Sequence, residues 1–252
     1  MPPTSLPLTG GFYVSRSLPI SAQECSNLYV HINEGGGLAD ESLFGTPGIN
    51  QLATSGGVLE VNRGSHVMAG IAYYVNGGEL YRLTRTISGT GVESFALDSL
   101  GVVTGSGRVS MADNGTQLCI LVKGSPSTGY IWNEGTSTFS TITDVNFKAN
   151  GEPQHVVYID GYFLFTTDSK KFIISSLNDG LTYNALDFGS AEADPDDIVA
   201  PVVLNNQLYI CGTETLELFR NAAATTGAAF PFIRVDAGVI STGIDRDWET
   251  NI

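Results

Sequence analysis

Gly161-Tyr162-Phe163-Leu164-Phe165 places a turn residue directly before a short apolar strand. The same arrangement occurs three more times in the chain of 252 residues, at Gly78-Glu79-Leu80-Tyr81, Gly115-Thr116-Gln117-Leu118-Cys119 and Asn206-Gln207-Leu208-Tyr209-Ile210. The leucines of the four copies stand at residues 80, 118, 164 and 208, so the copies lie 38, 46 and 44 residues apart. Because a spacing of roughly 40–50 residues is typical of propeller blades, the repeat predicts a β-propeller.

Short strand patterns continue on both sides of these copies and indicate an all-β fold. They recur about every 8–12 residues, separated by Gly, Asn and Asp, as in a sandwich, barrel or propeller. The turns Asn76-Gly77, Asp160-Gly161 and Asn205-Asn206 suit the positive φ of tight hairpins. The similar spacing of the copies favours a propeller over a sandwich. The predicted strands are Val67–Val75, Leu80–Thr84, Gln117–Val122, Gly129–Trp132, Val156–Ile159, Tyr162–Thr166, Phe172–Ser175, Leu208–Cys211 and Leu216–Phe219.

The chain is expected to have three parts. Residues 1–48 contain three prolines within the first seven positions and two glycine clusters, which predict an extended arm packed on the body. Residues 49–244 carry the strand repeats and predict a propeller-like body. About four blade-sized units fit there, at the small end of the roughly four to eight blades that close a ring, so an incomplete propeller is expected. Residues 245–252 are polar and predict an irregular end.

The composition restricts the classes of function. Hydrophobic residues make up 42% and charged residues 15% of the chain, which argues against disorder. No apolar run approaches the roughly 18 residues of a membrane span, and the first residues lack the pattern of a signal peptide, so a soluble protein made in the cytosol is expected.

The 26 acidic and 12 basic side chains give a formal net charge of −14. This charge repels nucleic acid phosphates and disfavours general DNA binding, whereas an acidic surface facing DNA would form a passage that does not adhere.

Cysteine and histidine are too sparse and too scattered to suggest a metal site. Cys25, Cys119 and Cys211 are read as buried free thiols, because their number and spacing do not fit a disulfide framework. The three histidines, at residues 31, 66 and 155, lack the spacing of zinc ligands. No metal and no cofactor is predicted.

Other candidate catalytic groups also have structural explanations. Glu192, Asp194, Asp196 and Asp197 could hold calcium or act as the paired carboxylates of a glycosidase, but Asp-Pro-Asp is a turn former whose side chains cap their own backbone. The segment Ser106–Ser110 lacks the lysine and serine that end a phosphate-binding loop, and no serine elbow precedes a helix. None of these groups therefore supplies a recognised catalytic motif.

Aromatic residues offer a different kind of candidate. Most of them alternate with other residues and are expected in a β core. Phe230-Pro231-Phe232 differs, because it follows the small-residue stretch from Asn221 to Ala229. Such an apolar segment is explained by a buried loop or a subunit interface.

Several strings resemble one family. They are Cys25-Ser-Asn-Leu-Tyr29, Phe44-Gly-Thr-Pro-Gly-Ile49, Gly105-Ser-Gly-Arg-Val-Ser-Met-Ala-Asp-Asn-Gly115, Asp187-Phe-Gly-Ser-Ala-Glu-Ala-Asp-Pro-Asp196, Thr215-Leu-Glu-Leu-Phe-Arg-Asn221 and Gly227-Ala-Ala-Phe-Pro-Phe-Ile-Arg234. Together they resemble the phage stabilisation protein family, the packaged-DNA stabilisation and tail hub accessory proteins of short-tailed bacteriophages. The resemblance covers about residues 20–244, and the ordered motifs make it more specific than one short match.

The resemblance implies a structural protein of the virion tail that is made in the host cytoplasm and is not an enzyme. Family members assemble as a homohexameric ring below the portal and its adaptor, extend the DNA channel as a hub or nozzle, and help to retain the genome until ejection. The implied partners are other copies, the portal-adaptor, distal tail proteins, and a tailspike, fibre or plug protein, while DNA passes through the lumen without sequence-specific binding. Members are larger, so this chain corresponds to about their first half and is expected to be truncated relative to them.

We predict that Arg108, Phe230, Pro231, Phe232 and Arg234 lie at an interface, with Arg108 as a buried or interfacial cation. Two other classes stay open from sequence. A receptor-binding or glycan-depolymerising phage propeller would have a loop cleft with paired carboxylates and aromatic platforms. A cellular interaction module would close its ring within one chain and stay monomeric.

Overall fold

The computed structural model describes residues 27–32, 41–48, 50–55, 61–194, 196–222 and 230–245. The chain divides into two compact units, residues 1–51 and residues 52–252, and each is described by itself. Several predictions lie outside the described residues: the thiol of Cys25, the first 26 residues of the arm, the stretch 223–229 and the end of the chain beyond Asp245.

The described part of the first unit is a hairpin. Strand β1 (Leu28–Ile32) pairs antiparallel with β2 (Glu41–Gly45). The Phe44 ring stacks on Tyr29 with centroids 5.9 Å apart and meets His31 edge-on at 5.6 Å. These cross-strand ring pairs stabilise the hairpin. The packing of this segment on the body stays a prediction.

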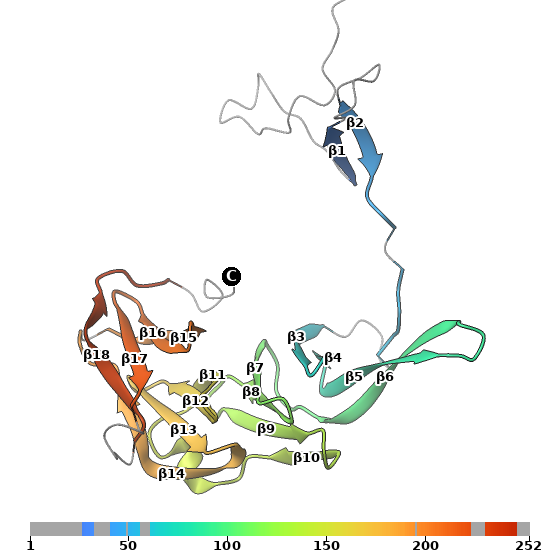
Figure 1. Cartoon of the computed structure of the whole chain (residues 1–252). Coiled ribbons are helices and arrows are strands. Elements are labelled where there is room, and N and C mark those ends of the chain that lie inside the picture. Colours follow the sequence, from blue (N-terminus) through green and yellow to red (C-terminus); the bar gives the residue numbers. More distant parts are fainter. Residues whose placement is uncertain are drawn as a thin grey trace, which may run out of the picture. The chain divides into compact units, whose positions relative to one another are not determined.

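The described residues of the second unit form four antiparallel four-stranded sheets, each with its strands in chain order (Figure 1). The first sheet consists of β3 (Asn62–Met68), β4 (Ile71–Asn76), β5 (Glu79–Ile87) and β6 (Glu93–Val102). The second consists of β7 (Val109–Asp113), β8 (Gln117–Val122), β9 (Thr128–Asn133) and β10 (Thr138–Thr141). The third consists of β11 (Pro153–Ile159), β12 (Tyr162–Thr167), β13 (Lys171–Ser176) and β14 (Asp179–Ser190), and the fourth of β15 (Ile198–Leu204), β16 (Gln207–Gly212), β17 (Leu216–Asn221) and β18 (Phe232–Ile240).

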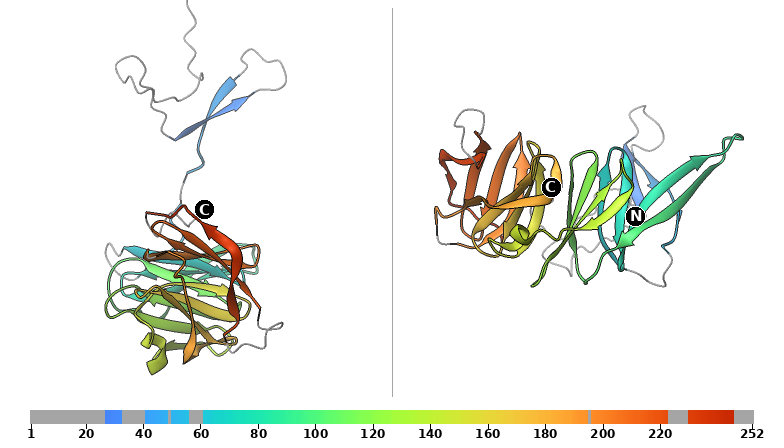
Figure 2. Two further views of the ribbon diagram at one scale, coloured as in Figure 1. Left: turned by 90° about the vertical axis from the view of Figure 1, so that its left-hand side faces the viewer. Right: turned by 90° about the horizontal axis from the view of Figure 1, so that it is seen from below.

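These sheets are the blades of a β-propeller, as the repeat predicts. Their first strands lie side by side in the order β3, β7, β11 and β15, so the blades follow one another around a common axis (Figures 1 and 2). The exception to the strand pattern in the described part of this unit is a short 3₁₀ helix, η1 (Val145–Lys148), between the second and third blades. The chain is therefore all-β with a propeller body.

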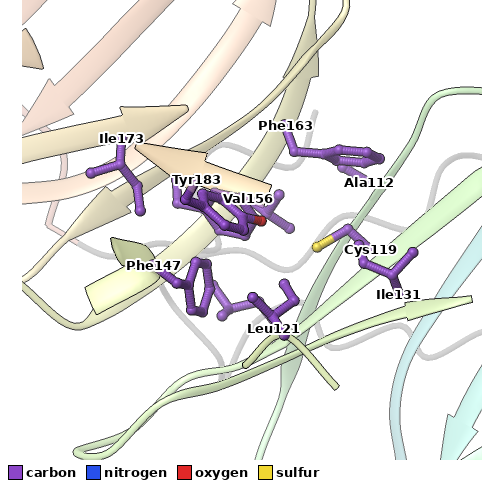
Figure 3. Packing of buried hydrophobic residues seen from close by; sticks show 11 residues of the cluster. Ala112, Cys119, Leu121, Ile131, Phe147, Val156, Phe163, Ile173 and Tyr183 are labelled. Carbon is purple, nitrogen blue, oxygen red and sulfur yellow. The ribbon is translucent and has the colours of Figure 1, made fainter. Parts of the chain in front are cut away.

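Three apolar clusters fill the spaces between successive blades. Alternate residues of β8 serve two of them, because successive side chains of a strand point to opposite faces. Leu118 and Ile120 pack toward the first blade. Cys119 and Leu121 pack toward the third blade, in the cluster that Figure 3 shows. Burial on both faces explains why strands such as β8 and β12 are continuous apolar runs in the sequence. Each large side chain that is buried contributes about 1.5–3 kcal/mol of hydrophobic stabilisation.

Two sequence predictions require correction at the first blade. The predicted strand Val67–Val75 is two strands, because Ala69 and Gly70 both have positive φ (50° and 80°) and form a tight turn. Leu80 consequently lies on the third strand of its blade, whereas Leu118, Leu164 and Leu208 lie on second strands. The second strands begin at residues 71, 117, 162 and 207, so the true blade spacing is 46, 45 and 45 residues.

The two cysteines in the described residues are free and buried, as predicted. Burial raises the pKa of the Cys211 thiol to about 11 and that of Cys119 further. Both thiols therefore stay protonated and unreactive at neutral pH.

Close packing within the third blade is tested by Gly189→Ala. A Cβ at Gly189 would overlap the ring of Phe172, which is fully buried, whereas a Cβ at Gly78 would meet nothing within 4 Å. We expect Gly189→Ala to lower the free energy of unfolding by about 1–3 kcal/mol and the control Gly78→Ala to change it little, as measured by urea denaturation. Equal effects of the two variants would contradict this packing.

Candidate interaction surfaces

The four first strands line a concavity of about 850 Å³ along the propeller axis. Its lining includes Arg63 and His66 from β3, Arg108 and Asp113 from the β7 segment, and His155 from β11, together with Val and Ala residues of β15. At one point His66 Nε2 lies 2.6 Å from the Asp113 carboxylate and joins the first blade to the second. The concavity along the propeller axis is thus lined in part by polar and charged side chains.

Arg63 is the buried cation of the described structure, with 6% of its surface exposed. Its guanidinium donates to the carbonyl oxygens of Gly107 (2.8 Å), Val103 (2.9 Å), Gly77 (3.0 Å) and Thr104 (3.4 Å). Burial lowers the pKa of Arg63, but an arginine keeps its charge. The side chain therefore fixes the turn after β4 and the crossover between the first two blades.

Glu134 forms a second polar tie between the first two blades. Its carboxylate accepts hydrogen bonds from Tyr73 (2.8 Å) and Arg82 (2.8 Å) of the first blade and from Trp132 Nε1 (2.7 Å) of its own blade. Burial alone would raise the pKa of Glu134, but the donors outweigh it and hold the pKa below its usual value. Burial, together with the bond to Glu134, raises the pKa of Tyr73 to about 12. The charges of Glu134 and Arg82 compensate each other, so this cluster has a structural role: it connects the first blade to the second.

The predicted interface segment at Phe230 lies against the third blade. Pro231 and Phe232 are buried, and Phe230 is half-buried with its ring 5.8 Å from Phe172. Phe232 also meets Tyr162 edge-on at 6.1 Å. Packing within the chain explains the burial of Pro231 and Phe232. Of the two explanations that the sequence offers, a buried loop or a subunit interface, this burial corresponds to the first. A subunit contact through Phe230 stays a prediction.

Arg234 is exposed but attached to the fourth blade. Its guanidinium lies 3.1 Å from the carboxylate of Glu217, whose side chain is 2% exposed. Glu217 also accepts a hydrogen bond from the backbone N–H of Ala193 (2.8 Å). Arg234 therefore neutralises a buried carboxylate while part of its surface stays available for a neighbour.

Arg108 is exposed at the rim of the concavity. The alternative of a buried Arg108 is therefore wrong, and the interfacial alternative stays a prediction. The reason lies in the backbone: a bulge between Asn62 and Gly64 in β3 turns Arg63 inward, while Arg108 stands one residue before β7 at the surface.

The acidic stretch before the fourth blade is structural at Asp196. This carboxylate accepts hydrogen bonds from the backbone N–H groups of Glu214 and Thr215, both at 2.9 Å. Burial alone would raise its pKa, but these donors lower it below its usual value. Glu192 and Asp194 are exposed. Asp196 thus has a structural role, but the backbone that it caps belongs to the turn between β16 and β17 and not, as the sequence predicts, to its own segment.

Within the described ranges, no group of three or more Cys, His, Asp or Glu side chains is arranged to hold a metal ion. Nor does any helix in that part of the chain have the length and apolar character needed to cross a membrane.

A model of the family described as "Bacteriophage P22 Gp10, beta-propeller" matches residues 4–245. The chain belongs to this family. Membership confirms the resemblance to phage stabilisation proteins and identifies the chain as a phage structural protein with a propeller fold.

No curated protein matches the sequence. Solved structures with some similarity include PorZ of Porphyromonas gingivalis, at 9% identity and a TM-score of 0.44, covering 71% of this chain and 23% of that one. Hsv2 of Kluyvelomyces marxianus is 9% identical with a TM-score of 0.47, over 82% of this chain and 61% of that one. The WD40 β-propeller domain of Doa1 is 13% identical with a TM-score of 0.36, over 69% and 56%. The chain spans less than half of each of the first three structures.

Sequence reasoning missed the two side chains that tie the first blades together, Arg63 and Glu134. A usable signal existed for Glu134, because Trp132 at the same face needs a hydrogen-bond acceptor when it is buried. No comparable signal marks Arg63, because its inward direction depends on the bulge in β3.

The Arg63 contacts are tested by Arg63→Lys, which keeps the charge but loses the planar set of donors. We expect the free energy of unfolding to fall by about 2–4 kcal/mol, because buried carbonyl oxygens lose their donors. Arg220→Lys on the exposed side of β17 is the matched control and should stay within about 0.5 kcal/mol of wild type. If Arg63→Lys matches the control in urea denaturation, the structural role of Arg63 is refuted.

The Glu134 tie is tested through its pH dependence. Because the pKa of Glu134 is lower in the folded state than its usual value of 4.5, the stabilisation is present above about pH 4.5 and is lost as pH falls through the folded-state pKa. We expect Glu134→Gln to lower the free energy of unfolding by about 1–3 kcal/mol at pH 7, with the difference shrinking below that window. The exposed Asp236→Asn serves as control. A difference that stays constant from pH 7 to pH 3 would argue against the carboxylate contacts.

Proposed function

We propose that this chain is a tail hub or nozzle subunit of a short-tailed phage. It extends the DNA channel below the portal-adaptor and helps to retain the packaged genome until ejection. The observation that carries this proposal is the family match over residues 4–245. We also infer that it acts as a ring of identical subunits and is not an enzyme.

The build of the propeller body supports a mechanical role. Apolar clusters join every pair of successive blades, and Arg63, Glu134 and the His66–Asp113 pair reinforce the first of these joints. A body packed in this way transmits load with little internal movement, because protein interiors resist compression. Such rigidity suits a subunit that holds its place around a channel.

The charge of the chain supports retention of DNA without adhesion. With a formal net charge of −14, the protein repels a polyanion, so DNA can slide past it during packaging and ejection. Retention then comes from the assembly and from a plug further along the channel, not from binding to phosphate.

The side-chain contacts support a non-enzymatic role. The carboxylates of Glu134, Asp196 and Glu217 each hold a structural partner across or within blades. A glycosidase requires two carboxylates that face a common cleft, about 5–10 Å apart. In the axial concavity the lining of described residues contains one carboxylate, Asp113.

The proposal predicts a defect in DNA retention when the protein is missing. A phage with an amber codon early in the gene should still package DNA in a non-suppressing host, because packaging precedes closure of the channel. The particles should then lose that DNA, so that a nuclease-protection assay recovers far less genome than from the same phage grown in a suppressing host.

Two outcomes would contradict this role. If the amber particles keep a full, nuclease-resistant genome but fail to bind cells, the protein recognises the host surface. If purified wild-type protein shortens host surface polysaccharide, the depolymerase alternative replaces the structural one.

A further inference from the structure

The hairpin of β5 and β6 extends beyond the first blade. β5 has nine residues, whereas the third strands of the other blades, β9, β13 and β17, have six each. β4 pairs with β5 as far as Arg82, but β5 and β6 stay paired out to Ile87 and Glu93. Residues 83–97, called the ribbon below, therefore form a two-stranded arm that projects from the propeller body (Figures 1 and 2).

The two sides of the ribbon differ in chemistry, because successive residues of a strand point to opposite faces. One side is mainly apolar and presents Leu83, Ile87, Phe95 and Leu97. The other side presents the small residues Thr84, Thr86, Ser94 and Ala96. Ile87 is 55% exposed, and Val92 in the turn is 64% exposed. A two-stranded ribbon alone is only marginally stable in water, so its exposed apolar side indicates contact with a partner.

The ribbon carries no net charge, although the chain as a whole is strongly acidic. The two charged residues of the ribbon, Arg85 and Glu93, form an ion pair with each other. With a formal net charge of −14, two copies of the chain repel each other overall. A neutral apolar surface is the kind through which such copies can meet, because the centres of protein interfaces are depleted of charged residues.

Exposed apolar residues also lie at the other end of the propeller body. β18 is the last strand in the order of the fourth blade, and its Val239 and Ile240 are 38% and 52% exposed. The ribbon and β18 lie at opposite ends of the body in Figure 1 and in the right-hand view of Figure 2. A contact between two different surfaces of one chain is heterologous, and it generates a ring where the rotation between copies closes.

We propose that the ribbon of one copy packs its apolar side on the β18 end of a neighbouring copy, at Val239 and Ile240. The identity of the partner rests on the ring of identical subunits proposed above, whereas the surface follows from the ribbon itself. Because the contact is apolar and the copies repel each other, salt should strengthen the association by screening that repulsion. An interface made of ion pairs would weaken with salt instead.

The experiment is sedimentation velocity of the purified full chain at concentrations up to about 100 micromolar. Ile87→Asp in the ribbon and Val239→Asp in β18 each place a carboxylate in the apolar contact. We expect either variant to weaken self-association roughly tenfold or more. Val145→Asp makes the same change on η1, at a residue that is 85% exposed, and should leave association unchanged.

A mixture of the two variants tests the heterologous geometry. The Ile87→Asp copy keeps an intact β18 end, and the Val239→Asp copy keeps an intact ribbon, so one sound contact can form between them. We expect the mixture to form dimers at a concentration at which each variant alone is monomeric. Circular dichroism checks that the variants are folded, and Val92→Asp in the turn of the ribbon serves as a second ribbon variant with the same expected result.

Three outcomes would overturn this contact. The wild-type chain could stay monomeric over the whole concentration range. Val145→Asp could weaken association as much as Ile87→Asp does, which would make the effect one of net charge. The mixture could stay monomeric, in which case the ribbon does not meet β18. If amber particles lose their DNA while the chain fails this test, the proposed role in the phage stands and only the contact is refuted.

Discussion

The central constraint on this structure is that the inner strands of the two middle blades are buried on both faces. β8 and β12 pack between two neighbouring blades, so every residue of their apolar runs contributes to one cluster or the other. Phe163 and Phe165 face the second blade while Leu164 faces the fourth. An isolated blade would expose both of these faces to water. Each blade is therefore stabilised by packing against its neighbours.

The joints between blades differ in chemistry. In the joint between the second and third blades, Phe147 of η1 and Phe165 and Tyr183 of the third blade are in mutual contact. The second blade contributes Ala112, Cys119, Leu121 and Ile131 to the same cluster. The joint between the first and second blades combines an apolar cluster with the charged ties of Arg63, Glu134 and Asp113. Arg63 is buried, and Glu134 and Asp113 are partly buried, so desolvation offsets part of the attraction that these ties provide.

Sequence reasoning predicted the propeller but not its exact register. Strands buried on both faces, such as Gln117–Val122 and Tyr162–Thr167, were visible as apolar runs. β6 and β14 were missed because they are long, half-exposed and rich in polar residues. The turn at Ala69-Gly70 was missed because alanine rarely takes positive φ, and this shifted the first copy of the repeat by one strand. Among the site residues, Arg108 was predicted as a buried or interfacial cation, whereas the burial of Arg63 depends on a β-bulge that composition does not reveal.

Family membership and the acidic charge of the chain fit a part of the virion that surrounds DNA without holding it. The most direct measurement is electron microscopy of the virion at a resolution that separates subunits. The account predicts propeller bodies of this chain arranged as a ring around the DNA channel, on the tail side of the portal, with the blade order seen here. Propeller density at peripheral spikes, away from the channel axis, would contradict it.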